Sequence, residues 1–411
     1  MRTLISILLF FCFFNSAKAR ILTVGKNKAY PTIREALQQS AGGDTIKVSG
    51  GIYHEKNLII NKPTVLIGIG YPVLDGEHKY ENISIKSSRV TIQGFKIIHS
   101  GVSSIEDIAA IKIYQCHDVV ITDNILEDTF FGIYSQNSLN CTIEKNRITG
   151  SNKEEQQSGN GIHCWKSDSM RIIANTITGH RDGIYFEFVT HSVIWRNISE
   201  NNLRYGLHFM FSSNDSYINN IFKNNGAGVS VMFSHDVKMV HNYFEENWGD
   251  GSYGLLLKEI TDSYIENNRF VKNTIGIYME GTSRIQMTKN VFERNGWGMK
   301  IQASCMDITV TANNFIGNTF DISTNGSLVL NTFNGNYWDK YDGYDLNKDK
   351  TGDVPYRPVS MYSVIIERNP PAIMLFRSFI TTLLDKTEKV LPSLTPENFK
   401  DAYPLMKPLR L

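Results

Sequence analysis

The sequence predicts an all-β protein, a right-handed parallel β-helix in which coils of about 22 residues stack along one axis. Two independent series of residues repeat with this period. Glycines that each open a short apolar segment stand at positions 132, 161, 183, 206, 228, 254, 276 and 298. Asparagines follow the same period as Asn124, Asn146, Asn175, Asn197, Asn220, Asn242, Asn268, Asn290 and Asn314.

Apolar residues alternate with variable ones after each glycine. In the coil that begins at Gly206, Leu207 and Phe209 are apolar, whereas His208 and Met210 take the alternate positions. A period of two is typical of β-strands. One coil is too small to bury its own apolar face, so the coils must stack. A rise of about 4.8 Å per coil then brings equivalent asparagine amides within hydrogen-bonding distance.

An antiparallel β-sandwich is the alternative fold. It predicts hairpin turns between alternating strands and offers no cause for a 22-residue period. The right-handed sense is expected from the usual preference of parallel crossover connections. The repeat therefore favours the β-helix.

The chain divides into four segments. Residues 1–19 have the pattern of a secretory signal peptide, with Arg2, an apolar run, and Ala17-Lys18-Ala19 as the cleavage site. Cleavage after Ala19 predicts an exported protein. The β-helix follows over residues 20–335, a loop or cap region over 336–369, and an amphipathic helical tail over 370–411.

An amphipathic helix is expected at the start of the β-helix. Ile33, Ala36 and Leu37 recur at helical spacing before Gly42 and Gly43. The first coil of a stack has an open apolar end, which such a helix can cover. Polar insertions near residues 99–109 and 151–160 are expected to project as loops.

Composition excludes some classes of function. Lys and Arg number 42 against 41 for Asp and Glu, which argues against nucleic-acid binding. No segment has the length of a transmembrane helix. Four cysteines remain after the signal peptide, and because they fall at different phases of the repeat we favour buried free thiols over disulfides. They are Cys116, Cys141, Cys164 and Cys305.

Oxygen-bearing side chains alternate in the cap region. Asp345, Asn347, Asp349 and Asp353 resemble a calcium-binding loop, which makes Ca²⁺ a candidate cofactor. Lys350 stands where the sharp-turn glycine is expected, and its charge opposes a cation. A turn rich in Asn and Asp that binds no metal is the alternative.

The tail carries more apolar surface than one packed face needs. Two prolines open a predicted helix with the stripe Ile373, Phe376, Phe379, Ile380, Leu383 and Leu384. The helix could fold over the last coil and cap it. It could equally dock on a partner, such as a membrane protein.

Four motifs of the C-terminal part are similar to a known family. Asn336-Tyr-Trp-Asp, Val354-Pro-Tyr-Arg-Pro358, Ile366-Glu-Arg-Asn-Pro-Pro371 and Tyr403-Pro404 resemble the NosD-type periplasmic accessory proteins of nitrous-oxide reductase. The resemblance covers the mature chain. It implies a non-enzymatic partner of an ABC-type ATPase and its transmembrane subunit. It also implies copper supply to the reductase, together with a copper chaperone.

A stripe of outward-facing positions could handle that copper. It contains Tyr134, Gln136, His163, Trp165, Tyr185, Glu187, His208, Met210, Ser230 and Met232. His208, Met210 and Met232 form a candidate site, because imidazole and thioether suit Cu(I). A surface stripe covered by a partner without metal is the alternative. His235, Met239 and His241 form a weaker second candidate, while His54, His78 and His117 are interpreted as exposed turn residues.

A polysaccharide lyase, epimerase or glycosidase is the rival class of function, because a β-helix offers a long groove. A lyase or epimerase needs clustered acids with a base, whereas a glycosidase needs paired carboxylates. The candidate groups are Asp182, Glu187, Glu280, Lys258 and Lys300, which are scattered over the coils. Glu187 with His208 is the best pair. A carbohydrate-binding solenoid that uses Tyr134, Trp165 and Tyr185 is a third possibility.

Overall fold

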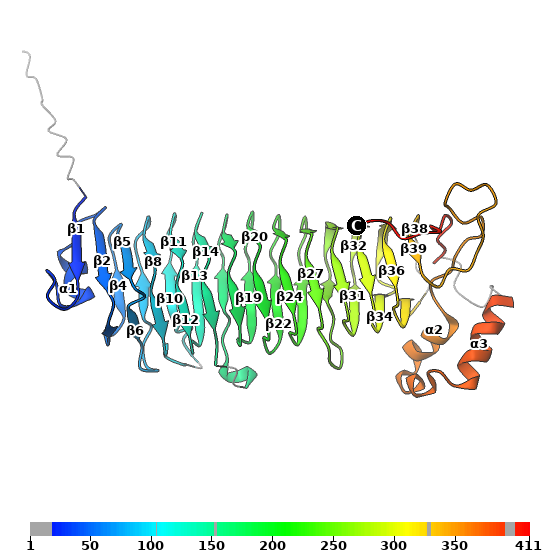
Figure 1. Ribbon diagram of the computed structural model, residues 1–411, viewed down its shortest axis with the longest axis horizontal. Helices are drawn as coiled ribbons and strands as arrows, with labels where there is room; N and C mark the ends of the chain where they lie inside the picture. Colours follow the sequence, from blue (N-terminus) through cyan, green and yellow to red (C-terminus); the bar gives the residue numbers. More distant parts are fainter. Residues whose placement is uncertain (1–18, 104, 152–153, 327–329, 391–398) are drawn as a thin grey trace, which may run out of the picture.

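Three parallel β-sheets wind around one apolar core and form a long rod (Figure 1). The computed structural model describes residues 19–103, 105–151, 154–326, 330–390 and 399–411. The predicted signal peptide falls on residues 1–18, outside the described residues, apart from Ala19. Each complete coil contributes one strand to sheet A, then one to sheet B and one to sheet C, and all described strand pairs are parallel.

The strands are short and follow one another in a fixed order. Sheet A consists of β1 (Ile21–Val24), β2 (Thr45–Ser49), β5 (Val65–Ile69), β8 (Thr91–Gln93), β11 (Val120–Thr122), β14 (Thr142–Glu144), β17 (Arg171–Ile173), β20 (Val193–Trp195), β23 (Ser216–Ile218), β26 (Lys238–Val240), β29 (Thr261–Glu266), β32 (Ser283–Thr288), β35 (Met306–Thr311) and β38 (Thr332–Asn334). Sheet B consists of β3 (Ile52–Tyr53), β6 (Val73–Asp75), β9 (Lys96–Ile98), β12 (Ile125–Glu127), β15 (Arg147–Thr149), β18 (Thr176–Thr178), β21 (Ile198–Glu200), β24 (Ile221–Lys223), β27 (Tyr243–Glu245), β30 (Arg269–Val271), β33 (Val291–Glu293), β36 (Asn314–Ile316) and β39 (Tyr337–Trp338). Sheet C consists of β4 (Leu58–Ile60), β7 (Ile83–Ile85), β10 (Ala109–Tyr114), β13 (Phe131–Gln136), β16 (Ile162–Trp165), β19 (Asp182–Glu187), β22 (Tyr205–Met210), β25 (Ala227–Met232), β28 (Leu255–Lys258), β31 (Ile275–Glu280), β34 (Trp297–Ile301) and β37 (Phe320–Ser323).

Aromatic rings fill the interior of the later coils. Each ring lies directly over the equivalent ring of the next coil, with centroids 4.2 to 5.5 Å apart, in the series Phe222, Phe244, Phe270, Phe292, Phe315 and Trp338. All six are fully buried. Isoleucine takes the same place in earlier coils, as at Ile148 and Ile177. The predicted inward positions and the parallel β-helix are confirmed.

The asparagines form a continuous ladder along the A-to-B turns. Each side-chain amide donates to the Oδ1 of the next asparagine at 3.0 to 3.1 Å, and that Oδ1 also accepts a backbone N–H. After Asn290 the ladder continues with Asn313, and its last asparagine is Asn336. The prediction that Asn314 belongs to the ladder is wrong by one position. Asn314 lies in β36 and forms hydrogen bonds with the backbone of Leu409 instead.

A second ladder occupies the B-to-C turns of the later coils. Its members are Asn202, Asn225, Asn247, Asn273, Asn295 and Asn318, which pair in the same manner. Asn225 and Asn247 also bond through a backbone N–H at 3.0 Å. Two amide ladders therefore fix the register of neighbouring coils from opposite ends of sheet B.

Removing one ladder amide is expected to destabilise the rod. Asn220 donates to the Ile194 carbonyl at 2.9 Å and to Asn242 at 3.0 Å, and it accepts from Asn197. In Asn220→Ala these buried groups lose their partners, so the free energy of unfolding should fall by about 3–5 kcal/mol. Urea unfolding followed by circular dichroism measures the change. The exposed Gln286→Ala should stay within about 0.5 kcal/mol, and an equal effect of both variants would contradict the ladder's role.

The N-terminal end is covered as predicted. Helix α1 (Ile33–Gln39) begins after Thr32, whose side chain accepts the Glu35 amide. Ile33, Ala36 and Leu37 are buried against the first coils. The predicted loop at 151–160 contains a short 3₁₀ helix, η1 (Glu155–Gln157), and projects from the rod (Figure 1).

The four cysteines are free and buried, which confirms the favoured interpretation of them as thiols. Burial raises the pKa of Cys141 to about 11 and raises that of Cys164 as well. Protonated thiols in an apolar core are poor nucleophiles and poor metal ligands. These cysteines therefore belong to the packing of the core.

The C-terminal segment departs from the predicted single helix. It forms α2 (Met361–Arg368), the 3₁₀ helix η2 (Pro370–Leu375) and α3 (Phe379–Val390). The break falls where Arg377 adopts a φ of 62°, which a continuous helix cannot contain. Ser378 then receives the Thr381 amide at the start of α3. The expectation of one unbroken stripe is corrected accordingly.

Two parts of the C-terminal segment cover the β-helix. Tyr362, Ile366 and Ala372 pack against an apolar cluster on the outer face of sheet C, at Trp297 and Phe320. Residues 399–411 return to the last coil and run back along the rod (Figure 1).

Asp401 ends the asparagine ladder. It accepts hydrogen bonds from the Asn336 side chain and from Trp338 Nε1, both at 3.0 Å. Its carboxylate takes the place that the next asparagine would have, and Phe399 beside it is fully buried. The non-helical end of the chain therefore caps the rod.

Candidate functional site

The outer face of sheet C carries two parallel rows of side chains. The register pairs Tyr134, His163, Tyr185, His208 and Ser230 in one row, one residue from each strand from β13 to β25. The second row is Gln136, Trp165, Glu187, Met210 and Met232. Both rows run along the rod as the alternation predicts.

The two rows differ in exposure. In the first row only Tyr185 is half-buried, and the others are buried, including His208 at 7% exposed. The second row is half-exposed throughout. Neighbouring rings of the first row lie edge to face or tilted, with centroids 4.5 to 4.7 Å apart from Tyr134 to His208. A molecule that approaches sheet C therefore meets the second row first.

Asp182, the first residue of β19, and Arg204, in the turn before β22, lie beside His208. Arg204 donates to both carboxylate oxygens of Asp182 at 2.9 and 2.6 Å. His208 Nδ1 lies 3.5 Å from Asp182 Oδ2. Burial raises the pKa of the fully buried Asp182, but the hydrogen bonds from His208 and Arg204 outweigh it, so the pKa lies below its usual value. His208 Nδ1 therefore faces both the Asp182 carboxylate and the Arg204 guanidinium, whose Nη2 lies 3.4 Å away.

The other ring nitrogen of His208 is available. His208 Nε2 is buried and has no hydrogen-bond partner among the described residues. His163 Nε2, two strands away, is in the same state. Burial, with the nearby Arg181, lowers the pKa of His163 to about 3, so this imidazole is neutral at physiological pH. A neutral imidazole nitrogen without a hydrogen-bond partner, as in His163, is suited to a metal ion.

The three residues of the predicted copper site lie on two adjacent strands. Met210 and Met232 are direct register partners on β22 and β25, and His208 precedes Met210 by two residues on the same face. Parallel strands lie about 4.8 Å apart, so the two thioethers are neighbours. This arrangement offers soft sulfur beside imidazole, the donor set that Cu(I) prefers.

The second candidate set is not brought together. Met239 is fully buried in β26 and points into the core. His235 lies in the turn before that strand, exposed and 2.8 Å from Asp236. His241 lies in the following turn at a φ of 56°. The prediction of one shared face is wrong because β26 spans only residues 238–240 and both histidines fall outside it.

The acidic loop of the cap region uses its oxygens on its own backbone. Asp345 accepts the amides of Asp349 and Lys350, and Asp349 accepts that of Thr351 at 2.7 Å. Asn347 bonds to Asp349, and Asp353 accepts the Leu346 amide at 2.6 Å. This is the geometry of a turn rich in Asn and Asp, which was the alternative to a calcium loop.

The apolar residues of the tail lie largely in solvent. Their exposed fractions run from 44% at Phe376 to 81% at Phe379, with Ile373, Ile380 and Leu383 between them and Leu384 half-buried. Thr381 is buried, and Glu388 binds the amide of Met361 at the start of α2. Helix α3 therefore turns polar groups toward α2 and leaves most of its apolar side chains uncovered.

The groups considered for polysaccharide chemistry do not form a cleft of paired acids. The register places Glu187 opposite Met210, and the acid at His208 is Asp182. Lys258 pairs with Glu280 at 3.7 Å, and Lys300 pairs with Glu367 of α2 at 3.0 Å. Lys258, Glu280, Lys300 and Asp182 are therefore engaged in ion pairs.

Sequence reasoning missed the group of Asp182, Arg204 and His208. From the sequence, Asp182 is predicted only as one of several scattered acids of a polysaccharide enzyme, and no role is predicted for Arg204. A usable signal was present, because the two residues are 22 positions apart, which equals the repeat. Residues separated by one period lie side by side in adjacent coils.

The protein is a parallel β-helix that carries imidazole and thioether side chains along the outer face of sheet C. Comparison with known families assigns the chain to one of them. The model for the periplasmic copper-binding protein (NosD) family matches residues 39–155 and 151–343. The chain therefore belongs to the NosD family of periplasmic copper-binding proteins, as the C-terminal motifs indicated.

Curated relatives agree with this assignment. A probable ABC transporter binding protein NosD from Stutzerimonas stutzeri is 26% identical over 94% of this chain and 92% of its own. The protein of the same description from Pseudomonas aeruginosa is 27% identical over 85% and 86%. Among solved structures, the A-module of Azotobacter vinelandii mannuronan C-5 epimerase AlgE4 superposes with a TM-score of 0.51 at 16% identity, covering 74% of this chain and 88% of that module. That likeness shows the fold alone.

Proposed function

We propose that this protein is a periplasmic accessory factor for nitrous-oxide reductase, exported by its signal peptide and retained at an ABC-type transporter. In this role it works with the ATPase and its transmembrane subunit, and takes part in passing copper from a chaperone to the reductase. The family match and the description of both relatives as ABC transporter binding proteins support the proposal. The described residues contain no helix that is both long and apolar enough to cross a membrane.

The uncovered apolar side of η2 and α3 is the observation that carries the proposal. Met374 and Phe379 are 86% and 81% exposed, and Ile380 and Leu383 exceed one half. So many large apolar side chains on one short segment mark a surface that another protein covers. The segment lies at one end of the rod (Figure 1), so it can be held by a membrane subunit while the coils extend away.

Charge substitution on α3 is expected to release the protein from its transporter. In Phe379→Asp with Leu383→Asp, two desolvated carboxylates would oppose docking, so the amount of membrane subunit that co-purifies should fall at least tenfold. The measurement is affinity purification from detergent-solubilised membranes of cells that co-express the ATPase and membrane subunit.

A matched control is available at the other end of the rod. Ile105 is 92% exposed and Val102 is 52% exposed, so Val102→Asp with Ile105→Asp also places two carboxylates on exposed apolar positions, far from the tail. This variant should co-purify at the wild-type level. If the α3 variant were recovered with as much transporter as the control, the apolar surface would not be the docking site.

The outer face of sheet C supports the copper part of the proposal. Half-exposed Met210 and Met232 could receive Cu(I), and His208 could add the nitrogen that lacks a partner. Copper is here a cargo that is bound and passed on. Half-exposed donors allow a partner to reach the ion, which transfer requires.

A further inference from the structure

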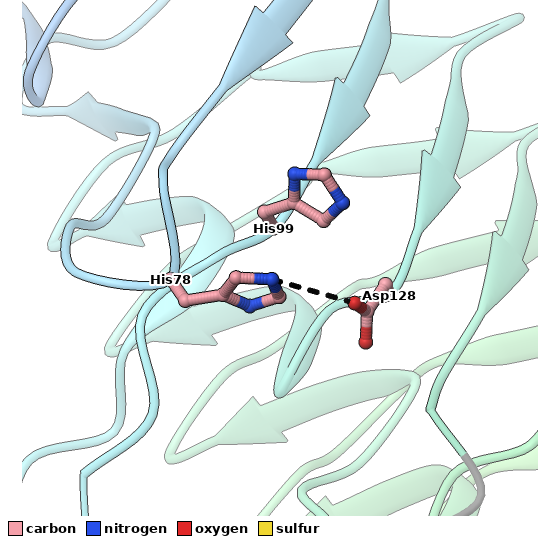
Figure 2. A group of neighbouring side chains, drawn as sticks. All are labelled: His78, His99 and Asp128. Carbon is pink, nitrogen blue, oxygen red and sulfur yellow. Dashed lines mark ion pairs between the residues drawn. The ribbon is translucent and has the colours of Figure 1, made fainter.

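Two histidines and an aspartate meet on a different edge of the rod. His78, His99 and Asp128 lie in the turns that follow β6, β9 and β12 of sheet B, and Figure 2 shows their side chains close together. Within the described residues they are the one group of three or more His, Cys, Asp and Glu side chains whose ligand atoms all lie within 4.8 Å of one another. None of the three belongs to the two rows of side chains on the outer face of sheet C.

The stacking of the coils brings these residues together. Strand register places Ile98 beside Asp75 and Glu127 beside Ile98. His99 and Asp128 directly follow the last residues of β9 and β12. They therefore occupy equivalent places in adjacent turns. The turn after Asp75 is longer and folds back, and the His78 amide donates to the His99 carbonyl at 2.9 Å.

The distances suit a metal ion after a small adjustment. His78 Nε2 lies 3.7 Å from Asp128 Oδ2, and the imidazoles of His78 and His99 have centroids 4.5 Å apart. Donors that share a tetrahedral Zn²⁺ at about 2.0–2.2 Å lie roughly 3.5 Å from each other. The three side chains are 36–51% exposed, so they can rotate toward one centre without disturbing the core.

A further carboxylate already orients one of the ligands. His99 Nδ1 lies 3.0 Å from Asp75 Oδ1, which leaves Nε2 directed elsewhere. Asp75 is itself held by the Glu77 amide at 2.9 Å and is 17% exposed. A carboxylate bound to the remote nitrogen of a histidine is the usual support of a metal ligand in proteins.

We propose that His78, His99 and Asp128 bind a divalent transition-metal ion, with Zn²⁺ as the representative. Two imidazoles and one carboxylate suit borderline divalent ions such as Zn²⁺ and Cu²⁺, whereas Cu(I) prefers the sulfur donors that this group lacks. Three protein ligands leave the fourth position open to water or to a donor from another molecule. The proposal is independent of the copper role assigned to sheet C.

Calorimetric titration of the full mature chain with Zn²⁺ tests this site. The wild type should bind one ion tightly at pH 7.5, and Asp128→Asn and His99→Gln should each bind at least about tenfold more weakly. Circular dichroism should show that both variants keep the wild-type fold, because the substituted side chains lie outside the core. In Cu²⁺-loaded protein, electron paramagnetic resonance should show nitrogen coupling that decreases in His99→Gln.

The control is an exposed histidine and aspartate pair without a third ligand. His235 lies 2.8 Å from Asp236 and is 56% exposed, much like His78. His235→Gln should retain the wild-type affinity. The proposal is overturned if the wild type binds no Zn²⁺ below about 100 μM, or if the two variants and the control share one affinity.

Discussion

Gly228→Ala is expected to destabilise the rod by at least about 4 kcal/mol, or to prevent folding. A Cβ at this position would lie 2.3 Å from the Gly254 carbonyl oxygen and 3.1 Å from Asn247 Nδ2. Both atoms are fixed, one by the backbone of the next coil and the other by the second asparagine ladder. Neighbouring coils must separate to admit the methyl group, which breaks strand pairing as well as packing.

Urea unfolding of the variant, followed by circular dichroism, measures this effect. Gly42→Ala is the matched control, because its Cβ would meet only Pro63 Cδ at an ordinary 3.7 Å. The control should change the free energy of unfolding by less than about 1 kcal/mol. Equal unfolding midpoints for the two variants would show that close approach does not explain the glycine series.

The same contact explains why the glycines revealed the fold. Gly132, Gly183 and Gly276 each face the carbonyl of the next coil at 2.4 to 2.7 Å from an ideal Cβ, and none has a positive φ. Their role is to allow close approach between coils, which recurs once per coil. Because every coil requires a residue without a Cβ at this contact, glycine recurs with the period of the coils. The fold could therefore be predicted without knowledge of the turns.

Positions within the strands were predictable for a related reason. Once the period is known, strand register follows, so the rows that contain Met210 and Met232 could be listed in advance. Exposure did not follow in the same way. His208 was expected on the surface, but Asp182 of strand β19 and Arg204 of the turn before β22 lie beside it, and it is buried.

Contacts made by turns could not be predicted. The first coils vary in length, since β6, β9 and β12 begin at residues 73, 96 and 125. No constant spacing therefore links His78 to His99 and Asp128. The break in the tail could not be predicted either. The helical pattern of apolar residues continues through residues 376–378, where the backbone turns and the helix is interrupted.

The largest functional effect is expected from removal of the two thioethers of sheet C. Met210→Leu with Met232→Leu keeps side-chain volume and apolar character, so the coils should stay intact. It removes the soft donors while His208 and its partner Asp182 remain in place. The affinity for Cu(I), measured by competition with a chromophoric chelator, should therefore fall at least about a hundredfold.

Maturation of nitrous-oxide reductase should fall with it, as measured by the copper content of reductase purified from cells that carry the variant. Met306→Leu is the matched control, because Met306 is 51% exposed at the start of β35 and has no predicted copper role. The control should keep both Cu(I) affinity and reductase copper. If the double variant matched the control in both measurements, the stripe would be a surface that a partner covers without metal, since the methionines would then contribute contact area alone.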